Sequence, residues 1–407
     1  MTTPASVRGV LLAGLAVTGS AAWAQDVKFH AFLDGRLVDA PSPTSFTEGG
    51  YGKTRYGSGD TRLQFGGGGL IVTAQATPSL FGLVDVQAQT TDHRMLGLVE
   101  SYLRYRPVSL SPWRWSLQAG VFFPPISLEN DGIGWTSPWT ITPSAINSWV
   151  GEELRDVGVQ GQLQWRGQSN SLAVTGALFR RNEIAGNILP TRGWSLSDLT
   201  YGLGERIRLP DQPSEDGQAP TERYDPFRRV TNQIGWHADL TWRAPGNTRV
   251  TLLRWDNHAD PRAWVPYEGG DRLYAWRTKF WSLGATTQSG PVTWIAQAME
   301  GGTLALPGTR HVQTHFRSAF VLVGWNQGAW RPALRVEHFS TDNDSSFGDG
   351  GEHGNAVTAA LAWRPRDWLR ITYELMRVDS YRSYLASAGQ SPNVKATQMQ
   401  VSARLLY

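Results

Sequence analysis

Charged side chains that alternate with apolar ones are the residues of this sequence best suited to act on a passing solute. Nine arginines and two glutamates have this placement: Arg36, Glu100, Arg104, Arg106, Arg114, Arg243, Arg331, Arg335, Glu337, Arg370 and Arg404. A guanidinium stays positively charged at physiological pH, so a row of them facing water lowers the barrier to entry of an anion. We expect these residues to line a lumen that prefers anions. For some, we also expect ion pairing across neighbouring strands, for example of Arg104 with Glu100 or of Arg331 with Glu337.

Motifs for catalysis are absent from the sequence. It contains no Gly-x-Ser-x-Gly, His-Glu-x-x-His or phosphate-cradling glycine loop, and its eight histidines are scattered. This scatter leaves a Ser/His/Asp arrangement open but does not indicate one. Asp342, Asp344 and Ser346 place oxygen atoms at alternate positions, which suits calcium, although an acidic external loop is the preferred interpretation. We predict no enzyme, no cofactor and no metal site.

The segments that carry these residues show the period of two that is typical of β-strands with two different environments. Between residues 157 and 165, for example, Val157, Val159, Leu163 and Trp165 share one face, and three glutamines share the other. The same reading predicts sixteen strands, with 14–18 possible: 27–39, 62–76, 79–90, 97–106, 113–123, 155–165, 171–180, 233–243, 249–256, 273–287, 291–299, 315–325, 330–339, 355–364, 368–378 and 395–407.

The connections between the expected strands alternate in length. Those after even-numbered strands are short, whereas most after odd-numbered strands are long: 40–61, 124–154, 181–232, 257–272, 300–314, 340–354 and 379–394. Short periplasmic turns and long external loops are characteristic of outer-membrane barrels. Lipid cannot satisfy an unpaired strand edge, so a spanning sheet must close. The sequence therefore predicts an all-β, transmembrane antiparallel β-barrel over residues 25–407.

The two ends of the chain fit export to a bacterial outer membrane. Residues 1–24 resemble a signal peptide, with Arg8, a short apolar stretch and an Ala22-Trp23-Ala24 cleavage site. An N-terminal membrane anchor is the alternative. Tyr407 ends an alternating strand, as in the C-terminal signal that the barrel assembly machinery reads. Cysteine is absent and the formal net charge is only +3, so neither disulfides nor a nucleic-acid partner is expected.

Tryptophan is frequent and gathers at the ends of expected strands beside short turns: Trp113, Trp165, Trp242, Trp330, Trp363 and Trp368. An aromatic belt at the boundary between lipid and water has this placement. A sugar-binding surface or ordinary core packing is the alternative. We expect the belt, with outer-membrane lipid around it.

The segment after the fifth expected strand has a distinctive pattern. The strand ends in Gly120-Val121-Phe122-Phe123-Pro124-Pro125, Ser127-Leu128-Glu129 follows, and a return strand begins Arg155-Asp156-Val157-Gly158. This pattern resembles the phosphate-selective porin O and P family. The matching residues are Gly120, Phe122, Phe123, Pro125, Ser127, Leu128, Glu129, Arg155, Val157 and Gly158.

The resemblance covers residues 120–158 together with the strand number and loop layout. It implies a sixteen-stranded pore narrowed by the 124–154 loop, and with porins of this size it implies a homotrimer. Phosphate selectivity is not carried over, because the family's lysine cluster has no counterpart among Lys28, Lys53, Lys279 and Lys395.

The 124–154 loop also has apolar residues of its own, including Trp135, Trp139 and Trp149, that a loop in solvent does not need. Folding into the barrel would bury them and leave charged residues to shape a constriction: Glu129, Asp131, Glu152, Glu153 and Arg155. A cap over the rim or against a neighbouring protomer is the alternative.

The expected function is a passive diffusion channel for small hydrophilic solutes. The first alternative is a barrel plugged by its own loops that serves in adhesion or structure. The others are a barrel-embedded lipid hydrolase and a secreted carbohydrate-binding protein.

Overall fold

The computed structural model describes residues 26–90, 95–210, 222–267, 271–346, 350–387 and 389–407. The expected signal peptide and its cleavage site lie outside this part of the chain. Within it, no helix is long and apolar enough to cross a membrane.

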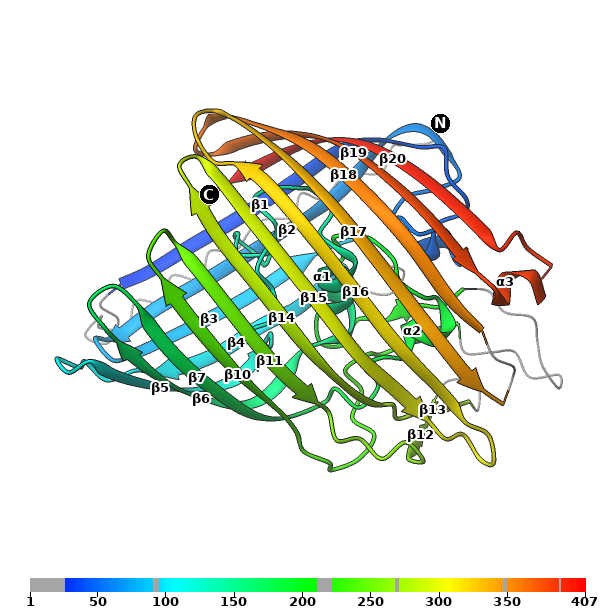
Figure 1. Cartoon of the computed structure of the whole chain (residues 1–407), viewed down its shortest axis with the longest axis horizontal. Coiled ribbons are helices and arrows are strands. Elements are labelled where there is room, and N and C mark those ends of the chain that lie inside the picture. The colour runs from blue at the N-terminus through cyan, green and yellow to red at the C-terminus, as the bar shows by residue number, and fades with distance from the viewer. Residues whose placement is uncertain (1–25, 91–94, 211–221, 268–270, 347–349, 388) are drawn as a thin grey trace, which may run out of the picture.

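Sixteen strands form one closed antiparallel barrel in which each strand pairs with the next one along the chain (Figure 1). They are β1 (Asp26–Ala40), β2 (Gly59–Thr77), β3 (Leu80–Ala88), β4 (Leu96–Tyr105), β5 (Trp113–Phe122), β6 (Asp156–Arg166), β7 (Ser171–Arg180), β10 (Gly235–Ala244), β11 (Thr248–Asp256), β14 (Arg277–Ser289), β15 (Val292–Ala305), β16 (Val312–Trp325), β17 (Trp330–Ser345), β18 (Gly350–Arg366), β19 (Leu369–Arg382) and β20 (Asn393–Leu406).

The barrel closes where β1 pairs with β20, from Phe32 opposite Leu406 to Asp39 opposite Met399. Closure leaves no unpaired edge in the sheet, as a lipid environment requires. The predicted fold class and all sixteen predicted strands are therefore confirmed, and the other elements lie in the long connections.

Several strands run further than the sequence predicted. Residues 340–354, expected as a long external loop, are mostly strand: β17 continues to Ser345 and β18 begins at Gly350. The expectation was wrong because the outward positions at this end are polar, for example His338 and Asp342, so apolar alternation stops while strand pairing continues. The expected strand 273–287 also divides, because Arg272–Tyr274 forms the separate strand β13.

The two faces of the barrel differ in the way that alternation predicted. Leucine, valine and tryptophan side chains are exposed on the outside, whereas inward positions are mostly polar or packed against loops. All six tryptophans of the expected belt are exposed, and Trp330 stacks on Trp363 with ring centroids 5.5 Å apart. They gather at the end with the short connections, called here the short-turn end; the opposite end is the long-loop end.

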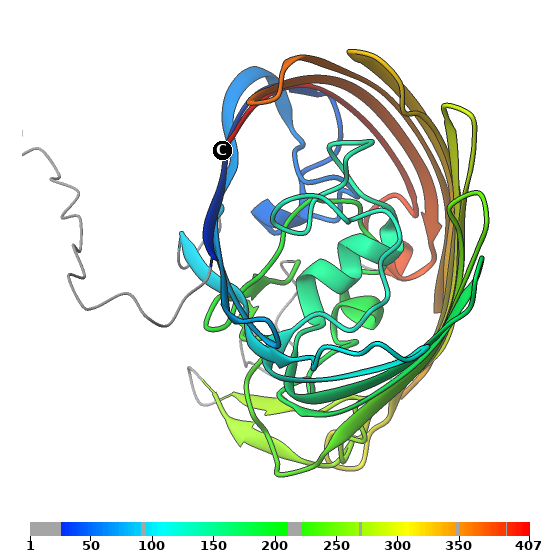
Figure 2. The same ribbon diagram turned by 90° about the vertical axis from the view of Figure 1, so that its left-hand side faces the viewer.

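Two long connections enter the barrel instead of extending from it (Figure 2). Residues 123–155 carry α1 (Ala145–Glu153), and residues 181–234 carry α2 (Ile188–Thr191), β8 (Ile207–Arg208) and β9 (Arg223–Tyr224). The other small elements are η1 (Phe46–Glu48), β12 (Trp264–Pro266), β13 (Arg272–Tyr274) and α3 (Tyr384–Ser387). Aromatic side chains fix α1 to the wall: the Trp149 ring centroid lies 5.5 Å from that of Phe280 and 5.3 Å from that of Phe316.

Candidate functional site

The inward loop 123–155 is attached to the wall by carboxylates that accept hydrogen bonds from its backbone. Glu337 on β17 accepts from the Ala145 N–H at 2.7 Å, in the first turn of α1. Glu374 on β19 accepts from the Ile141 N–H at 2.6 Å. The first N–H groups of a helix have no partner within the helix, and its positive end favours a carboxylate. Glu337 therefore holds the start of α1 in place, and Glu374 holds the segment just before it.

Arg335 lies at the centre of this attachment and is fully buried. Its guanidinium donates to Glu337 at 2.8 Å and to Glu129 of the loop at 3.4 Å. It also donates to the carbonyls of Thr142 and Pro143 at 2.8 and 3.1 Å. A buried charge needs such partners. The structure thus places Arg335, Glu337 and Glu129 in one buried cluster, away from open water.

A second buried cluster joins β1 to the connection 181–234. Arg36 donates to Asp34 at 2.8 Å and to Asp198 at 2.5 Å, and Arg55 donates to Asp198 at 2.9 Å. Arg404 donates to Asp34 at 2.6 Å. Burial alone would raise the pKa of the Asp198 carboxyl, but the guanidiniums of Arg36 and Arg55 hold it well below its usual range. Arg36 and Arg404, predicted to line the lumen, lie in this cluster.

Glu153 ends α1 and is completely buried. It accepts from Tyr224 Oη at 2.5 Å, from Trp149 Nε1 at 2.7 Å and from the Gly186 N–H at 2.7 Å. Burial raises the pKa of its carboxyl to about 7, although these hydrogen bonds act in the opposite direction. Glu153 therefore links α1 to the second inward loop.

The remaining residues predicted for the constriction also lie mostly in contacts. Glu152 pairs with Arg192, and Arg155 donates to the Tyr201 carbonyl at 2.7 Å. Trp139 and Trp149 are buried, and Trp135 stacks on Phe123 with centroids 4.1 Å apart. Of the charged residues predicted for the constriction, only Asp131 is exposed. Glu100, predicted for the lumen, accepts from the Phe123 N–H at 3.2 Å where the loop begins.

Arginines gather inside the barrel towards its short-turn end. Arg106 lies within electrostatic reach of Arg104, Arg114 and Arg166, and Arg243 on β10 pairs directly across the sheet with Arg249 on β11. The wall beside them is polar: Gln162 donates to Thr175 at 3.2 Å, and the Thr241 and Thr251 hydroxyls lie 3.1 Å apart. Gln162 and Arg243 are exposed. This part of the wall is therefore open to water.

The inward arginines that were missed from the sequence include Arg166, Arg249 and Arg364. Arg166 and Arg364 follow the last alternating apolar residue of their strands. Arg249 is the first residue of the expected strand 249–256. The signal that identifies Arg249 is the short turn after Ala244, because pairing across it places Arg249 opposite Arg243. Alternation along β18 places Arg364 on the same, inward face as Ala362.

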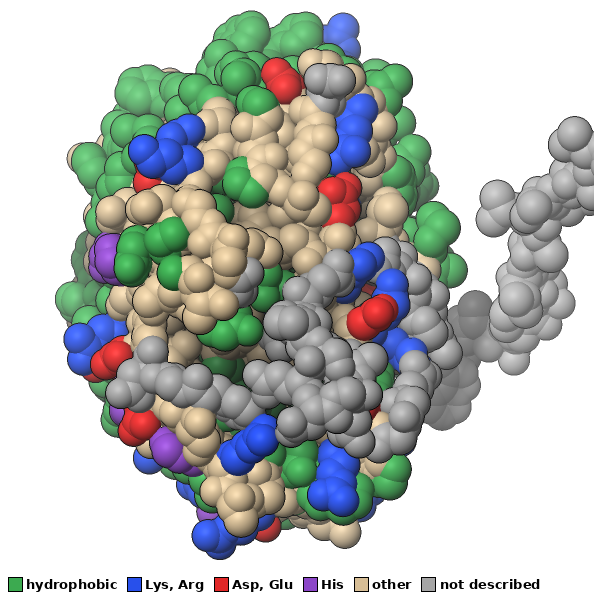
Figure 3. Space-filling model, turned by 90° about the vertical axis from the view of Figure 1, so that its right-hand side faces the viewer, with side chains coloured by type: hydrophobic (Ala, Val, Ile, Leu, Met, Phe, Trp, Pro, Cys, Tyr) green, Lys and Arg blue, Asp and Glu red, His purple; other side chains and the backbone are tan. Residues whose placement is uncertain are grey.

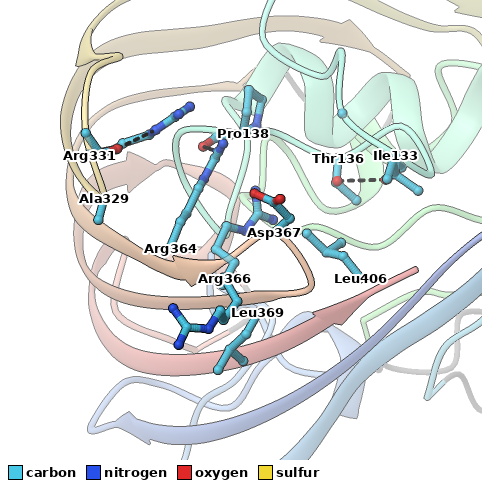
Figure 4. A pocket seen from close by; sticks show the side chains of 13 residues that line it. Ile133, Thr136, Pro138, Ala329, Arg331, Arg364, Arg366, Asp367, Leu369 and Leu406 are labelled. Atoms are coloured by element: carbon cyan, nitrogen blue, oxygen red, sulfur yellow. Dashed lines mark hydrogen bonds between the residues drawn. The ribbon is translucent and has the colours of Figure 1, made fainter.

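A cavity of about 440 Å³ lies at the short-turn end, between the tip of the inward loop and strands β17 to β19 (Figure 4). Its charged lining residues are Arg331, Arg364, Arg366, Arg370 and Asp367. Arg331 and Arg370 were predicted to face the lumen. Arg364 reaches the loop and donates to the Pro138 carbonyl at 3.1 Å.

The long-loop end carries scattered Lys, Arg, Asp and Glu side chains among hydrophobic and other surface (Figure 3). The candidate calcium ligands Asp342 and Asp344 lie on β17, and the described residues contain no group of three or more acids or histidines placed to hold a metal ion. Residues 347–349 of that candidate lie outside the described part.

One hydrogen-bonded Ser/His/Asp trio occurs at the long-loop end. Ser346 Oγ lies 3.0 Å from His311 Nδ1, and His311 Nε2 lies 2.9 Å from Asp344 Oδ1. The His311 and Asp344 side chains are 44% and 72% exposed, so water competes for both contacts. Catalytic triads work in a desolvated site with an oxyanion hole. The trio therefore gives little support to the hydrolase alternative.

No protein-family model and no curated protein sequence matches the chain. Solved structures do. The outer membrane channel DcaP of Acinetobacter baumannii is 12% identical with a TM-score of 0.53, over 95% of this chain and 99% of that chain. OmpT, an outer membrane protein of Vibrio cholerae, with loop L8 deleted, is 11% identical with a TM-score of 0.51, over 94% and 99%. At such low identity, these likenesses establish the fold.

Proposed function

We propose that this chain is a passive channel of the bacterial outer membrane for small hydrophilic anions. The observation that carries the proposal is a pair of like charges placed directly opposite each other across the sheet on its inner face, Arg243 and Arg249. Like charges directly opposite one another destabilise a sheet. A barrel with only a structural role gains nothing from them, whereas fixed positive charge in a watery pore favours anions.

The apolar exterior and the tryptophan belt support a membrane location, with the short-turn end in the periplasm. The proposal includes export with cleavage near Ala24, recognition of Tyr407 by the barrel assembly machinery, surrounding outer-membrane lipid and a possible homotrimer. Kinship with the phosphate-selective porin family rests on the local resemblance at residues 120–158. DcaP, one of the proteins of similar fold, is itself described as a channel.

The second candidate is a barrel plugged by its own loops that acts in structure or adhesion. The buried contacts of α1 favour it, since every residue of that helix is buried and its ends are tied to the wall and to the second loop. The two candidates agree on the fold and differ in whether solutes pass the loops along the open wall near Gln162.

Solute entry into vesicles separates the candidates. The full chain, refolded into liposomes, is diluted into isotonic solutions of an anionic, a neutral and a cationic solute of similar size. We expect swelling with all three and the fastest swelling with the anion. Swelling at the rate of empty liposomes in every solution would favour the plugged barrel, and fastest swelling with the cation would contradict the anion preference.

A further inference from the structure

Another cavity, of about 500 Å³, lies at the long-loop end, where the connection between β1 and β2 meets the connection between β19 and β20 (Figure 1). One wall comes from the segment 43–51, which contains η1, and the other comes from α3 and residues 390–394. The volume lies within the range of about 300–1,000 Å³ that is usual for small-molecule sites. The cavity shares no lining residue with the cavity at the short-turn end.

The first wall is folded tightly and is fixed to the barrel. The Gly52 N–H donates to the Thr44 carbonyl at 2.8 Å, and a methyl group added at Gly50 would collide with the same carbonyl. Ser42 Oγ donates to the Thr397 carbonyl at 2.6 Å, which ties this segment to β20, the strand that begins in the other wall. A ligand therefore need not order these loops, which is a cost that weakens binding elsewhere.

The cavity has an apolar floor and polar groups above it. Tyr51, Leu385 and Val394 are buried and pack on one another. Gln390 and Asn393 are exposed, and their side-chain amides form no hydrogen bond with any residue that the structure describes. Each amide offers two donors and one acceptor. An apolar surface with a few well-placed polar groups is the usual composition of a small-molecule site.

The charge of the cavity favours a neutral ligand. Among the described residues that line it, Glu48 alone is charged, and its carboxylate pairs with Arg62 at 3.4 Å. An ionic ligand would lose water here without gaining an unpaired counter-charge. A hydroxyl group, in contrast, can donate to an amide oxygen and accept from an amide N–H. The lining therefore suits a ring with an apolar face and hydroxyls along its edge.

We propose that this cavity binds a neutral saccharide, with the C–H face of one sugar ring on the apolar floor and its hydroxyls on the amides of Gln390 and Asn393. The cavity lies among the long loops and outside the contacts that hold the inward loops. Its ligand is therefore a dissolved sugar at the mouth of the barrel and not a solute within the lumen. The site exists whether or not the barrel conducts.

Binding of methyl glycosides to the full chain tests the proposal. The refolded protein is placed in nanodiscs of phosphatidylcholine, and the methyl glycosides of glucose, galactose, mannose and N-acetylglucosamine are titrated separately by saturation-transfer NMR. We expect saturable binding of at least one of the four. The bound sugar should slow hydrogen exchange of the backbone at 43–51 at least threefold.

Two variants locate the bound sugar. Gln390→Leu and Asn393→Leu should each weaken binding at least threefold, and the double variant at least tenfold. Both side chains are exposed, so the changes should leave the barrel folded. Absence of saturable binding by all four glycosides, or unchanged affinity in the double variant, would overturn the proposal.

Matched controls separate this site from other polar surface. Gln168→Leu makes the same change on an exposed amide in the short turn after β6, and the affinity should not change. Gln162→Leu removes an amide from the inner wall and should also leave the affinity unchanged; a loss of binding there would place the sugar in the lumen and contradict the proposal.

Charged sugars and membrane sugars test the class and the source of the ligand. Glucuronate and glucosamine carry a charge of either sign on the same ring and should bind at least threefold more weakly than the neutral glycosides. Tighter binding of either would overturn the neutral class. Nanodiscs with lipopolysaccharide and no free sugar should leave exchange at 43–51 fast; slow exchange there would instead assign the ligand to the saccharide of the membrane itself.

Discussion

Arg243 and Arg249 face each other directly across β10 and β11 on the inner face of the barrel, joined by the short turn after Ala244. Asp131 of the inward loop lies within electrostatic reach of Arg249. A guanidinium stays protonated at physiological pH, so two arginines beside one acid leave positive charge at this edge of the lumen.

Loss of these charges should reduce ion selectivity. Arg243→Gln and Arg249→Gln should each lower the chloride-to-potassium permeability ratio by about twofold, or roughly 0.4 kcal/mol, as expected for one charge screened by water and salt. The ratio comes from the reversal potential across a planar bilayer with a potassium chloride gradient. Arg317→Gln on the outer face is the matched control and should leave the ratio unchanged.

Glu337 should be needed to hold α1. Glu337→Ala removes the acceptor of the Ala145 N–H and leaves Arg335 with the more distant Glu129 as its remaining ion-pair partner. Breaking a buried pair on one side costs about 3–5 kcal/mol. The urea midpoint of the refolded barrel should fall accordingly. Glu300→Ala, at an outward side chain that is 66% exposed, should change the free energy of unfolding by less than about 0.5 kcal/mol. Equal effects of the two variants would exclude the anchoring role.

The contact of Trp139 with β16 should control how tightly the loop fills the lumen. A methyl group added at Gly324 would lie 2.2 Å from Trp139 Cε3, so the glycine leaves room for the indole. Trp139→Ala should destabilise the barrel by about 3–5 kcal/mol and raise its conductance, because the loop loses its wall contact. Trp281→Ala, on the outward face, is the control for loss of an indole. An unchanged conductance in Trp139→Ala would place the ion path elsewhere.

Stability should fall as pH rises from about 4.5 to 7, because burial raises the pKa of Glu153 from 4.5 to about 7. In this interval the folded protein holds a proton that the unfolded chain has released, so the cost of ionising Glu153 grows with pH, up to about 3 kcal/mol. Burial lowers the pKa of Lys53 to about 8, although Glu352 opposes the shift, so its effect falls in a separate, more alkaline interval.

The variant Glu153→Gln should make the pH dependence of the urea midpoint between pH 4.5 and 7 less steep than in the wild-type barrel. Glu300→Gln removes an exposed acid and should follow the wild type. If Glu153→Gln also keeps the wild-type slope, Glu153 is not the group that titrates.

The barrel could be predicted because its outer and inner faces carry different kinds of side chain at alternate residues of every strand. Alternation no longer identifies a strand towards the long-loop end, as at Asp342, because outward residues there become polar while pairing continues. The inward loop could be anticipated from its own apolar residues, such as Trp139 and Trp149.

The partners of the loop's charges could not be anticipated. Glu129 and Glu153 look like constriction residues in the sequence, but Arg335 and Tyr224, which bind them, are 206 and 71 positions away in the chain. Only the closed barrel brings these residues together. The alternation along the strands predicted an excess of inward arginine, whereas the gathering of these arginines at the short-turn end depends on strand register.

Single-channel recording of the refolded full chain in a planar bilayer tests the central claim most directly. We predict stepwise currents with a reversal potential that favours chloride over potassium. Stable insertion into the bilayer without current would contradict the account and identify the buried loops as a permanent plug.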